Sequence, residues 1–136
     1  EIENYKYKGY IDLVLQTQDG NYHIIDWKTC SWGWSARRKT ERVTTYQLTF
    51  YKYYFAQKHN IDLDNIKTHF ALLKRTAQEN KVEIFEVLSG KKKIKNALNF
   101  LKKAMYNIIN KKFIKNKLSC HAPYGTCEFY KTQHCP

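Results

Sequence analysis

Long apolar runs are missing from this 136-residue sequence, and none approaches the roughly 20 residues that a membrane-spanning helix needs. No signal peptide, internal repeat or low-complexity linker is visible either. Hydrophobic residues nevertheless make up 43% of the chain, which excludes an extended disordered polypeptide and suffices for one core. We therefore expect a soluble, cytoplasmic globular protein.

Acidic residues are also scarce, since 12 Asp and Glu stand against 24 Lys and Arg. The formal charge of +12 favours a polyanionic partner, and nucleic acid is the commonest one. The alternative source of this composition is an AT-rich genome, whose codons favour Lys, Asn, Ile and Tyr.

Cysteines are few and unevenly placed. Cys30 stands alone, whereas Cys120, Cys127 and Cys135 crowd near the end of the chain. In a secreted disulfide scaffold the cysteines would be distributed along the whole chain. Ligation of a metal ion or cluster is therefore the more specific hypothesis for these three.

Periodicity predicts an alternation of strands and helices. Strands are expected at residues 5–16, 22–28, 66–74 and 81–88, helices at 43–58 and 91–114, loops at 29–42 and 60–64, and an irregular tail at 118–136. The order β-β-α-β-β-α predicts an α/β fold with a mixed sheet flanked by helices. The lysine-rich side of the 91–114 helix is either simply solvated or in contact with nucleic acid.

Two aspartates interrupt the first two expected strands. Asp12 lies between Ile11 and Leu13, and Asp26 lies between Ile25 and Trp27. Acids are depleted in strands and costly to bury without a partner, and such violations concentrate at functional sites. The alternative is an edge strand whose acids face solvent.

The turn between these strands fixes which side chains share a face. A three-residue loop at positions 18–20, with Gly20 in the positive-φ position, places Asp12 directly opposite Asp26 on one face of the sheet. A two-residue turn at Asp19 and Gly20 would put the acids on opposite faces. In the first register, which we favour, Lys28 follows on the face of Asp26.

Two adjacent carboxylates repel each other unless a cation lies between them. Mg²⁺, or Mn²⁺ in its place, suits such hard oxygen ligands, polarises a phosphate oxygen and makes its bound water more acidic. A neighbouring lysine can orient that water or neutralise charge that develops on the phosphate. The trio Asp12, Asp26 and Lys28 therefore predicts phosphodiester hydrolysis.

Three motifs in this order resemble the RecB-like exonuclease branch of the PD-(D/E)xK nuclease superfamily. They are G-x-x-D at residues 9–12, I-I-D-W-K-T at 24–29 and Q-x-x-x-Y at 47–51. The resemblance implies a restriction-endonuclease-like core over residues 1–117, with the Cys-rich segment 118–136 packed on it.

The resemblance also implies individual roles. Asp12, Asp26 and the backbone carbonyl of Trp27 would bind the metal, and Lys28 would be the catalytic lysine. Gln47 and Tyr51, one helical turn apart, would reach the DNA strand or support Lys28. The alternative for Tyr51 is a place in the core.

The chain departs from the pattern of this family at two points. Relatives usually carry a further metal ligand, His or Glu, on a helix before the first strand. Nothing precedes Glu1 here, so that ligand is either absent or upstream of the sequence. Many relatives also bind a four-iron, four-sulfur cluster through one upstream and three C-terminal cysteines.

Cys120, Cys127 and Cys135 would be the three C-terminal ligands of such a cluster, although their spacing is wider than is common in those relatives. Zinc ligation with help from His121 or His134, and free or paired thiols, remain the alternatives.

The loop after the second strand combines basic and aromatic residues. Arg37, Arg38 and Lys39, beside Trp32 and Trp34, suit a single nucleic-acid strand, whose phosphates pair with the former and whose bases stack on the latter. The alternative is a loop folded over its own tryptophans.

We expect a DNase that acts on DNA ends or single strands. The resemblance places it in bacterial or phage recombination, repair or defence, where a helicase or another recombination or defence protein is a possible partner. Rival hypotheses are an endonuclease or junction resolvase of the same fold, against which the Gln47 and Tyr51 pair argues, and a catalytically inactive DNA-binding module.

Overall fold

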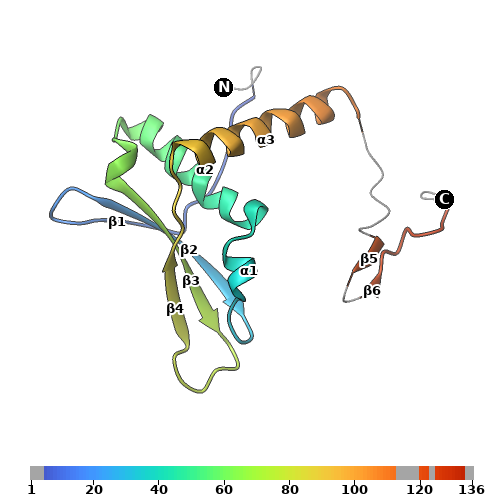
Figure 1. The fold of residues 1–136 in the computed structure, drawn as a ribbon, viewed down its shortest axis with the longest axis horizontal. Coiled ribbons are helices and arrows are strands. Elements are labelled where there is room, and N and C mark those ends of the chain that lie inside the picture. Colours follow the sequence, from blue (N-terminus) through green and yellow to red (C-terminus); the bar gives the residue numbers. More distant parts are fainter. Residues whose placement is uncertain (1–4, 113–119, 123–124, 134–136) are drawn as a thin grey trace. The chain divides into compact units, whose positions relative to one another are not determined.

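The computed structural model describes residues 5–112, 120–122 and 125–133. The chain divides into two compact units, Glu1–Lys103 and Ala104–Pro136, and each is treated by itself. Its elements are β1 (Leu13–Gln16), β2 (Tyr22–Cys30), α1 (Ala36–Lys39), α2 (Arg42–His59), the short 3₁₀ helix η1 (Leu63–Asn65), β3 (Ile66–Lys74), β4 (Val82–Glu86), α3 (Lys91–Ile109), β5 (His121–Ala122) and β6 (Gly125–Thr126) (Figure 1).

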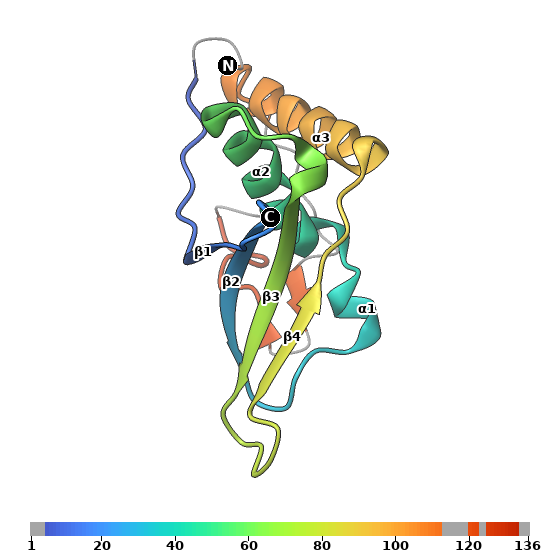
Figure 2. The same ribbon diagram turned by 90° about the vertical axis from the view of Figure 1, so that its left-hand side faces the viewer.

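A mixed four-stranded sheet forms the centre of the first unit. Its strand order is β1-β2-β3-β4, with β1 and β4 antiparallel to their neighbours and β2 parallel to β3 (Figure 2). The parallel pair requires a crossover, which α1 and α2 provide between β2 and β3. The expected α/β fold with a mixed sheet and flanking helices is confirmed.

The β1–β2 hairpin has the register that the sequence favours. Leu13 pairs with Ile25 and Gln16 with Tyr22, so the next position outward sets Asp12 against Asp26. The backbone N–H of Thr17 donates to the carbonyl of Asn21 at 2.9 Å, which closes a three-residue loop. Gly20 in that loop has a φ of 81°, a left-handed conformation that glycine adopts without strain.

The first strand is shorter than expected. The expectation of a strand over residues 5–16 is wrong for residues 5–12, which the structure leaves outside β1 apart from an isolated bridge at Tyr5. The ring of Tyr7 stacks on Tyr54 of α2, with centroids 4.5 Å apart, and also contacts Phe50. Packing of aromatic rings against α2 thus replaces strand pairing in this segment.

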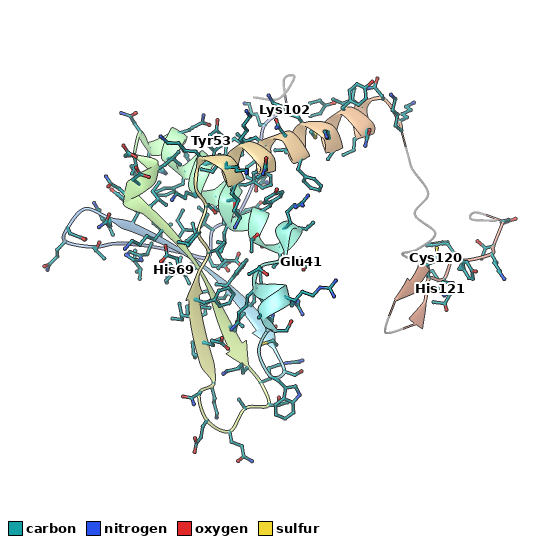
Figure 3. The ribbon with its side chains drawn as sticks, in the orientation of Figure 1. Glu41, Tyr53, His69, Lys102, Cys120 and His121 are labelled. Atoms are coloured by element: carbon teal, nitrogen blue, oxygen red, sulfur yellow. The ribbon has the colours of Figure 1, made fainter. Side chains whose placement is uncertain are left out.

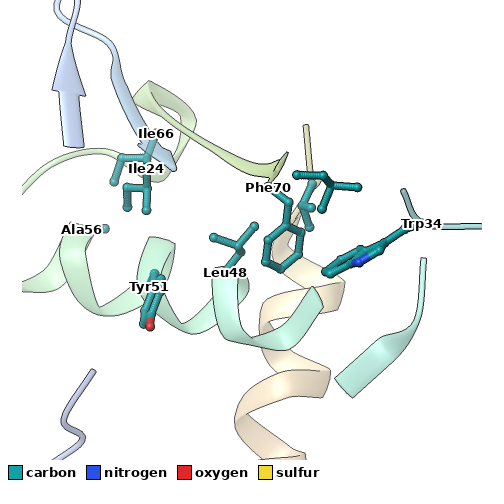
Figure 4. Close-up of a cluster of buried hydrophobic side chains, with 9 residues drawn as sticks. Ile24, Trp34, Leu48, Tyr51, Ala56, Ile66 and Phe70 are labelled. Carbon is teal, nitrogen blue, oxygen red and sulfur yellow. The ribbon is translucent and has the colours of Figure 1, made fainter. Parts of the chain in front are cut away.

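The hydrophobic core lies between the sheet and α2. Leu48, Tyr51 and Ala56 of the helix meet Ile24 of β2 and Phe70 of β3 in one buried cluster (Figure 4). Because strand side chains alternate, Ile24, Asp26 and Lys28 all lie on this helix-covered face. The helix is apolar on more than one side, since its Tyr46 also contacts Phe100 of α3 at 5.8 Å between ring centroids.

The opposite face of the sheet is less covered. Trp27 and Ile84 are among its exposed apolar side chains. His69 of β3 lies on this face too, with its Nε2 3.0 Å from Nδ1 of His23 (Figure 3). Burial, and then the charge of His23, lower the pKa of His69.

Helix α3 follows Ser89 and Gly90, as expected, but it ends at Ile109 rather than near residue 114. The backbone then turns at Lys111, whose φ of 51° is left-handed. None of the helices in the described parts of the chain is long and apolar enough to span a membrane.

A small antiparallel hairpin, β5–β6, belongs to the second unit, where the sequence predicts only an irregular tail. The backbone N–H of Cys127 donates to the carbonyl of Cys120 at 2.9 Å, so two of the three clustered cysteines occupy facing positions on this hairpin. Cys135 and His134 lie outside the described residues, and ligation by the cysteines stays a prediction. Packing of residues 118–136 on the core likewise stays a prediction.

Candidate active site

Asp26 is the buried acid at the centre of β2. Its side chain keeps 2% of its surface exposed, and Oδ1 accepts a hydrogen bond from Nε2 of Gln47 at 3.0 Å. Burial raises the pKa of Asp26, and the charge of Asp12 raises it further, against the opposing effect of Lys28. The fold therefore keeps a carboxyl group where its charged form is disfavoured, which is typical of functional sites.

The second oxygen of Asp26 has the Lys28 ammonium as its neighbour. Oδ2 lies 2.6 Å from Nζ of Lys28, with which it forms an ion pair. Among the described residues, Oδ2 and the indole nitrogen of Trp34 are the only buried side-chain polar atoms without a hydrogen-bond partner. A buried carboxylate oxygen that already attracts an ammonium is suited to accept a metal cation in its place.

Asp12 precedes β1 directly and is exposed to solvent. Its Oδ2 accepts a hydrogen bond from the backbone N–H of Trp27 at 2.9 Å, which ties the acid to the strand that carries Asp26. The hairpin register and this bond together bring the two aspartates to one end of the β1–β2 pair.

Lys28 lies two residues after Asp26 and is partly exposed. Its ammonium lies 5.9 Å from the centre of the Phe70 ring, on β3 beside Asp26. Among the described residues Asp26 is the ion-pair partner of Lys28, and a third of the lysine side chain is exposed, so a bound anion could reach its ammonium.

Gln47 of α2 connects the sheet to the helix. Its amide nitrogen donates both to Asp26 and to the hydroxyl oxygen of Tyr51, each at 3.0 Å. Tyr51 is buried, as the alternative interpretation held, and its hydroxyl points out of the apolar cluster (Figure 4). Contact of either residue with DNA stays a prediction. The structure does contain the hydrogen bonds that join Tyr51, Gln47 and Asp26.

Gly9 has a steric role that the motif alone does not reveal. A Cβ atom at this position would lie 2.8 Å from Cε1 of Tyr51 and 3.2 Å from Cε1 of Tyr7. The glycine therefore lets the extended N-terminal segment pass against the buried tyrosine. The three sequence motifs form one contact path, from Gly9 through Tyr51 and Gln47 to Asp26.

Gly9→Ala should loosen this path. Because Tyr51 is buried, its ring has little room to move, so we expect overpacking to cost about 1–3 kcal/mol of unfolding free energy. Gly90→Ala is the matched control, since nothing lies within 4 Å of its added Cβ. Chemical denaturation of both variants measures the difference, and equal losses would contradict the steric role.

The two tryptophans of the loop after β2 differ in burial. Trp34 is buried, with 8% of its surface exposed, and packs on Phe70, whereas Trp32 is 77% exposed. The alternative of a loop folded over its own tryptophans is therefore correct for Trp34. Trp32 alone remains available for stacking on a base.

The basic residues of α1 also differ in their surroundings. Lys39 forms an ion pair with Glu83, and the guanidinium of Arg38 lies 4.6 Å from the centre of the Trp34 ring. Arg37 is exposed. Contact of these residues with DNA stays a prediction. Among the described residues, Arg37 is the one of the three for which neither an ion pair nor an aromatic contact is seen.

The donor set of the site fits a hard divalent cation. Asp12 and Asp26 supply two carboxylates, of which that of Asp26 is buried. Within the described residues no group of three or more His, Cys, Asp or Glu side chains is gathered tightly enough to hold a metal ion. Mg²⁺ keeps several waters and binds through one or two carboxylates, so Asp12 and Asp26 are ligands of the type and number that this ion needs.

A family model described as the PD-(D/E)XK nuclease superfamily matches residues 3–136, nearly the whole chain. No curated protein and no solved structure gives a match.

Proposed function

The chain belongs to the PD-(D/E)XK nuclease superfamily, and on that premise we propose that it is a metal-dependent DNA exonuclease. The observation that supports this most directly is the geometry around Asp26. A buried acid with a raised pKa, a second acid and a lysine meet at one place. Members of the superfamily are generally nucleases, and their usual cofactor is Mg²⁺ or Mn²⁺.

Asp12 and Asp26, with the backbone carbonyl of Trp27, are the proposed ligands. A divalent cation bound there would polarise a phosphate oxygen and lower the pKa of a bound water. Gln47 donates to Oδ1 of Asp26, so the cation would bind Oδ2, where it competes with the Lys28 ammonium. This division fixes the orientation of the carboxylate before any ligand binds.

Lys28 is the proposed catalytic lysine. In hydrolysis the oxygen of a water molecule forms a new bond to phosphorus, one P–O ester bond breaks, and the departing oxygen takes up a proton. Negative charge grows on the phosphate oxygens during this exchange. The Lys28 ammonium, partly exposed beside Asp26, is placed to stabilise that charge and to orient the attacking water.

An exonuclease on ends or single strands is the finer part of the proposal. It rests on the Q-x-x-x-Y motif at residues 47–51 and on two exposed residues of the segment after β2, Trp32 and Arg37. The setting in bacterial or phage recombination, repair or defence, with a helicase or another recombination or defence protein as partner, follows from the resemblance alone.

One assay tests this function. The purified chain with Mg²⁺ or Mn²⁺ should release nucleotides from end-labelled linear DNA and leave covalently closed circular DNA intact, whereas EDTA should abolish the release. Cleavage of closed circles at a comparable rate would replace the exonuclease proposal with an endonuclease. Absence of cleavage on every DNA would support a silent binding module.

A further inference from the structure

Two neighbouring hollows run between the start of α2 and the first turns of α3. The larger, about 650 Å³, is lined by Thr40, Arg42, Thr45, Tyr46, Gly90, Lys91, Lys92, Lys93 and Asn96. The smaller, about 360 Å³, shares Arg42, Tyr46 and Asn96 and adds Asn99, Phe100 and Lys103. We call the two together the α2–α3 groove. All of its residues belong to the first unit, Glu1–Lys103.

The groove is basic and has no acid in its lining. Five of its side chains are Lys or Arg, and the acid next to Arg42 in sequence, Glu41 at the N-cap of α2, accepts a hydrogen bond from Thr44 at 2.7 Å instead of pairing with them. Within the described parts of the chain, ion pairs form only among other residues. Lys93 forms a hydrogen bond to a carbonyl group and not an ion pair: its Nζ donates to the backbone oxygen of Leu88 at 3.0 Å.

Like charges gathered in this way repel one another and destabilise the fold unless an anion neutralises them. Burial also lowers the pKa of Lys93, because its ammonium is partly removed from water. Within the described residues no ion pair neutralises the five cations of the groove, and a chain of phosphates is an anion that suits a row of such charges.

The remaining groove residues favour a single strand over a purely ionic contact. Phe100 is 47% exposed and lies against Tyr46. Asn96 and Asn99 line the same wall and offer amide donors and acceptors. Lysines that follow a phosphate backbone, combined with an exposed ring for base stacking, are the usual means of binding single-stranded nucleic acid.

We propose that the α2–α3 groove is a second DNA contact, which holds a single strand away from the Asp12–Asp26–Lys28 centre. The inference rests on the proposed nuclease function and adds to it a path for the strand beyond the reacting phosphate. Arg42, Lys91 and Lys92 bind phosphates in this path, and Phe100 stacks on a base.

Binding of a fluorescent 20-nucleotide oligo(dT), measured by anisotropy without divalent metal, tests the groove apart from catalysis. Removing two phosphate contacts with Lys91→Gln and Lys92→Gln should lower the affinity about 25-fold at 0.1 M salt and reduce the slope of log affinity against log salt by about 1.4. Arg42→Gln should give about half of that change in slope.

Lys95→Gln with Lys102→Gln is the matched control, because it removes the same charge from exposed positions of α3 outside the groove (Figure 3 labels Lys102). The control should change affinity by no more than a few fold. Equal losses in the control and in the groove variant would overturn the proposal, since they would reflect net charge alone. Circular dichroism and thermal melting establish that both variants are folded.

Cleavage assays separate this inference from the proposed function. If both hold, the groove variant should cleave a long strand with a KM raised about tenfold and should hydrolyse a dinucleotide at the wild-type rate. Loss of dinucleotide hydrolysis in the groove variant alone would overturn the groove as a separate contact. If the wild type hydrolyses no DNA but the groove variant still binds oligo(dT) more weakly, the nuclease function is contradicted and the proposed DNA contact in the groove is supported.

Discussion

Asp26→Asn should abolish DNA cleavage while the fold stays intact. The substitution keeps the shape of the side chain and leaves Oδ1 to accept from Gln47, but it removes the negative charge that the cation requires. Since cation and lysine act together on the same phosphate, we expect a fall in kcat of about 10³-fold or more. Initial rates on end-labelled linear DNA at saturating Mg²⁺ measure this loss.

The same substitution should raise stability at neutral pH. Burial raises the pKa of Asp26, so the ionised carboxylate is less favourable in the folded protein than in the unfolded chain. The protonated form is therefore the stabilising one. Its contribution is complete below the ordinary aspartate value of about 3.9 and is lost as pH rises through the higher folded pKa.

A neutral asparagine does not carry this cost. The melting temperature of Asp26→Asn should accordingly exceed that of the wild type at pH 7, and the gain should shrink to zero in acid, where Asp26 is protonated in both states. Differential scanning calorimetry from pH 2.5 to pH 8, a range that extends below the ordinary aspartate value of about 3.9, follows the difference.

Asp64→Asn is the control for both effects. Asp64 is an exposed acid in η1, so its substitution should change neither the cleavage rate nor the pH dependence of the difference in melting temperature. Cleavage by Asp26→Asn within tenfold of the wild type would show that the metal site lies elsewhere. A less stable Asp26→Asn at pH 7 would show that Lys28 outweighs the cost of burial.

The sequence predicts the geometry of the hairpin well because two local rules fix it. Strand side chains alternate with a period of two, and a glycine in the positive-φ position selects the loop length. Together these rules set Asp12 against Asp26 and Lys28 on the same face, and the register of β1 and β2 bears this out. Both rules act over a few residues, so one sequence suffices to apply them.

Features that depend on distant residues were not predictable in the same way. The stacking of Tyr7 on Tyr54 shortens β1, and the closeness of Gly9 to Tyr51 exists only once α2 lies on the sheet. Trp32 and Trp34 are identical in type and two residues apart, yet one is exposed and the other is core. Residue type predicts which interactions a side chain can make, whereas tertiary packing decides which of two like residues is buried and which is exposed.

The ion pair between Lys28 and Asp26 leads to the second large effect. Nζ of Lys28 lies 2.6 Å from the Asp26 oxygen that we assign to the cation, so lysine and cation compete for this atom. Lys28→Gln removes the competitor. It should therefore bind Mn²⁺ at least as tightly as the wild type, as measured by electron paramagnetic resonance of free Mn²⁺, although the activity is lost.

The loss of activity should be about 10²–10³-fold, the range for removing one group that stabilises developing charge. Lys28→Arg retains the positive charge beside Asp26, so its Mn²⁺ affinity should match that of the wild type, while its planar guanidinium cannot replace the compact ammonium and cleavage stays impaired. Lys81→Gln, at an exposed position just before β4, should behave as the wild type in both measurements. Weaker Mn²⁺ binding in Lys28→Gln would mean that the lysine supports the metal site instead of competing with the cation, and Oδ2 of Asp26 would no longer be the assigned ligand atom.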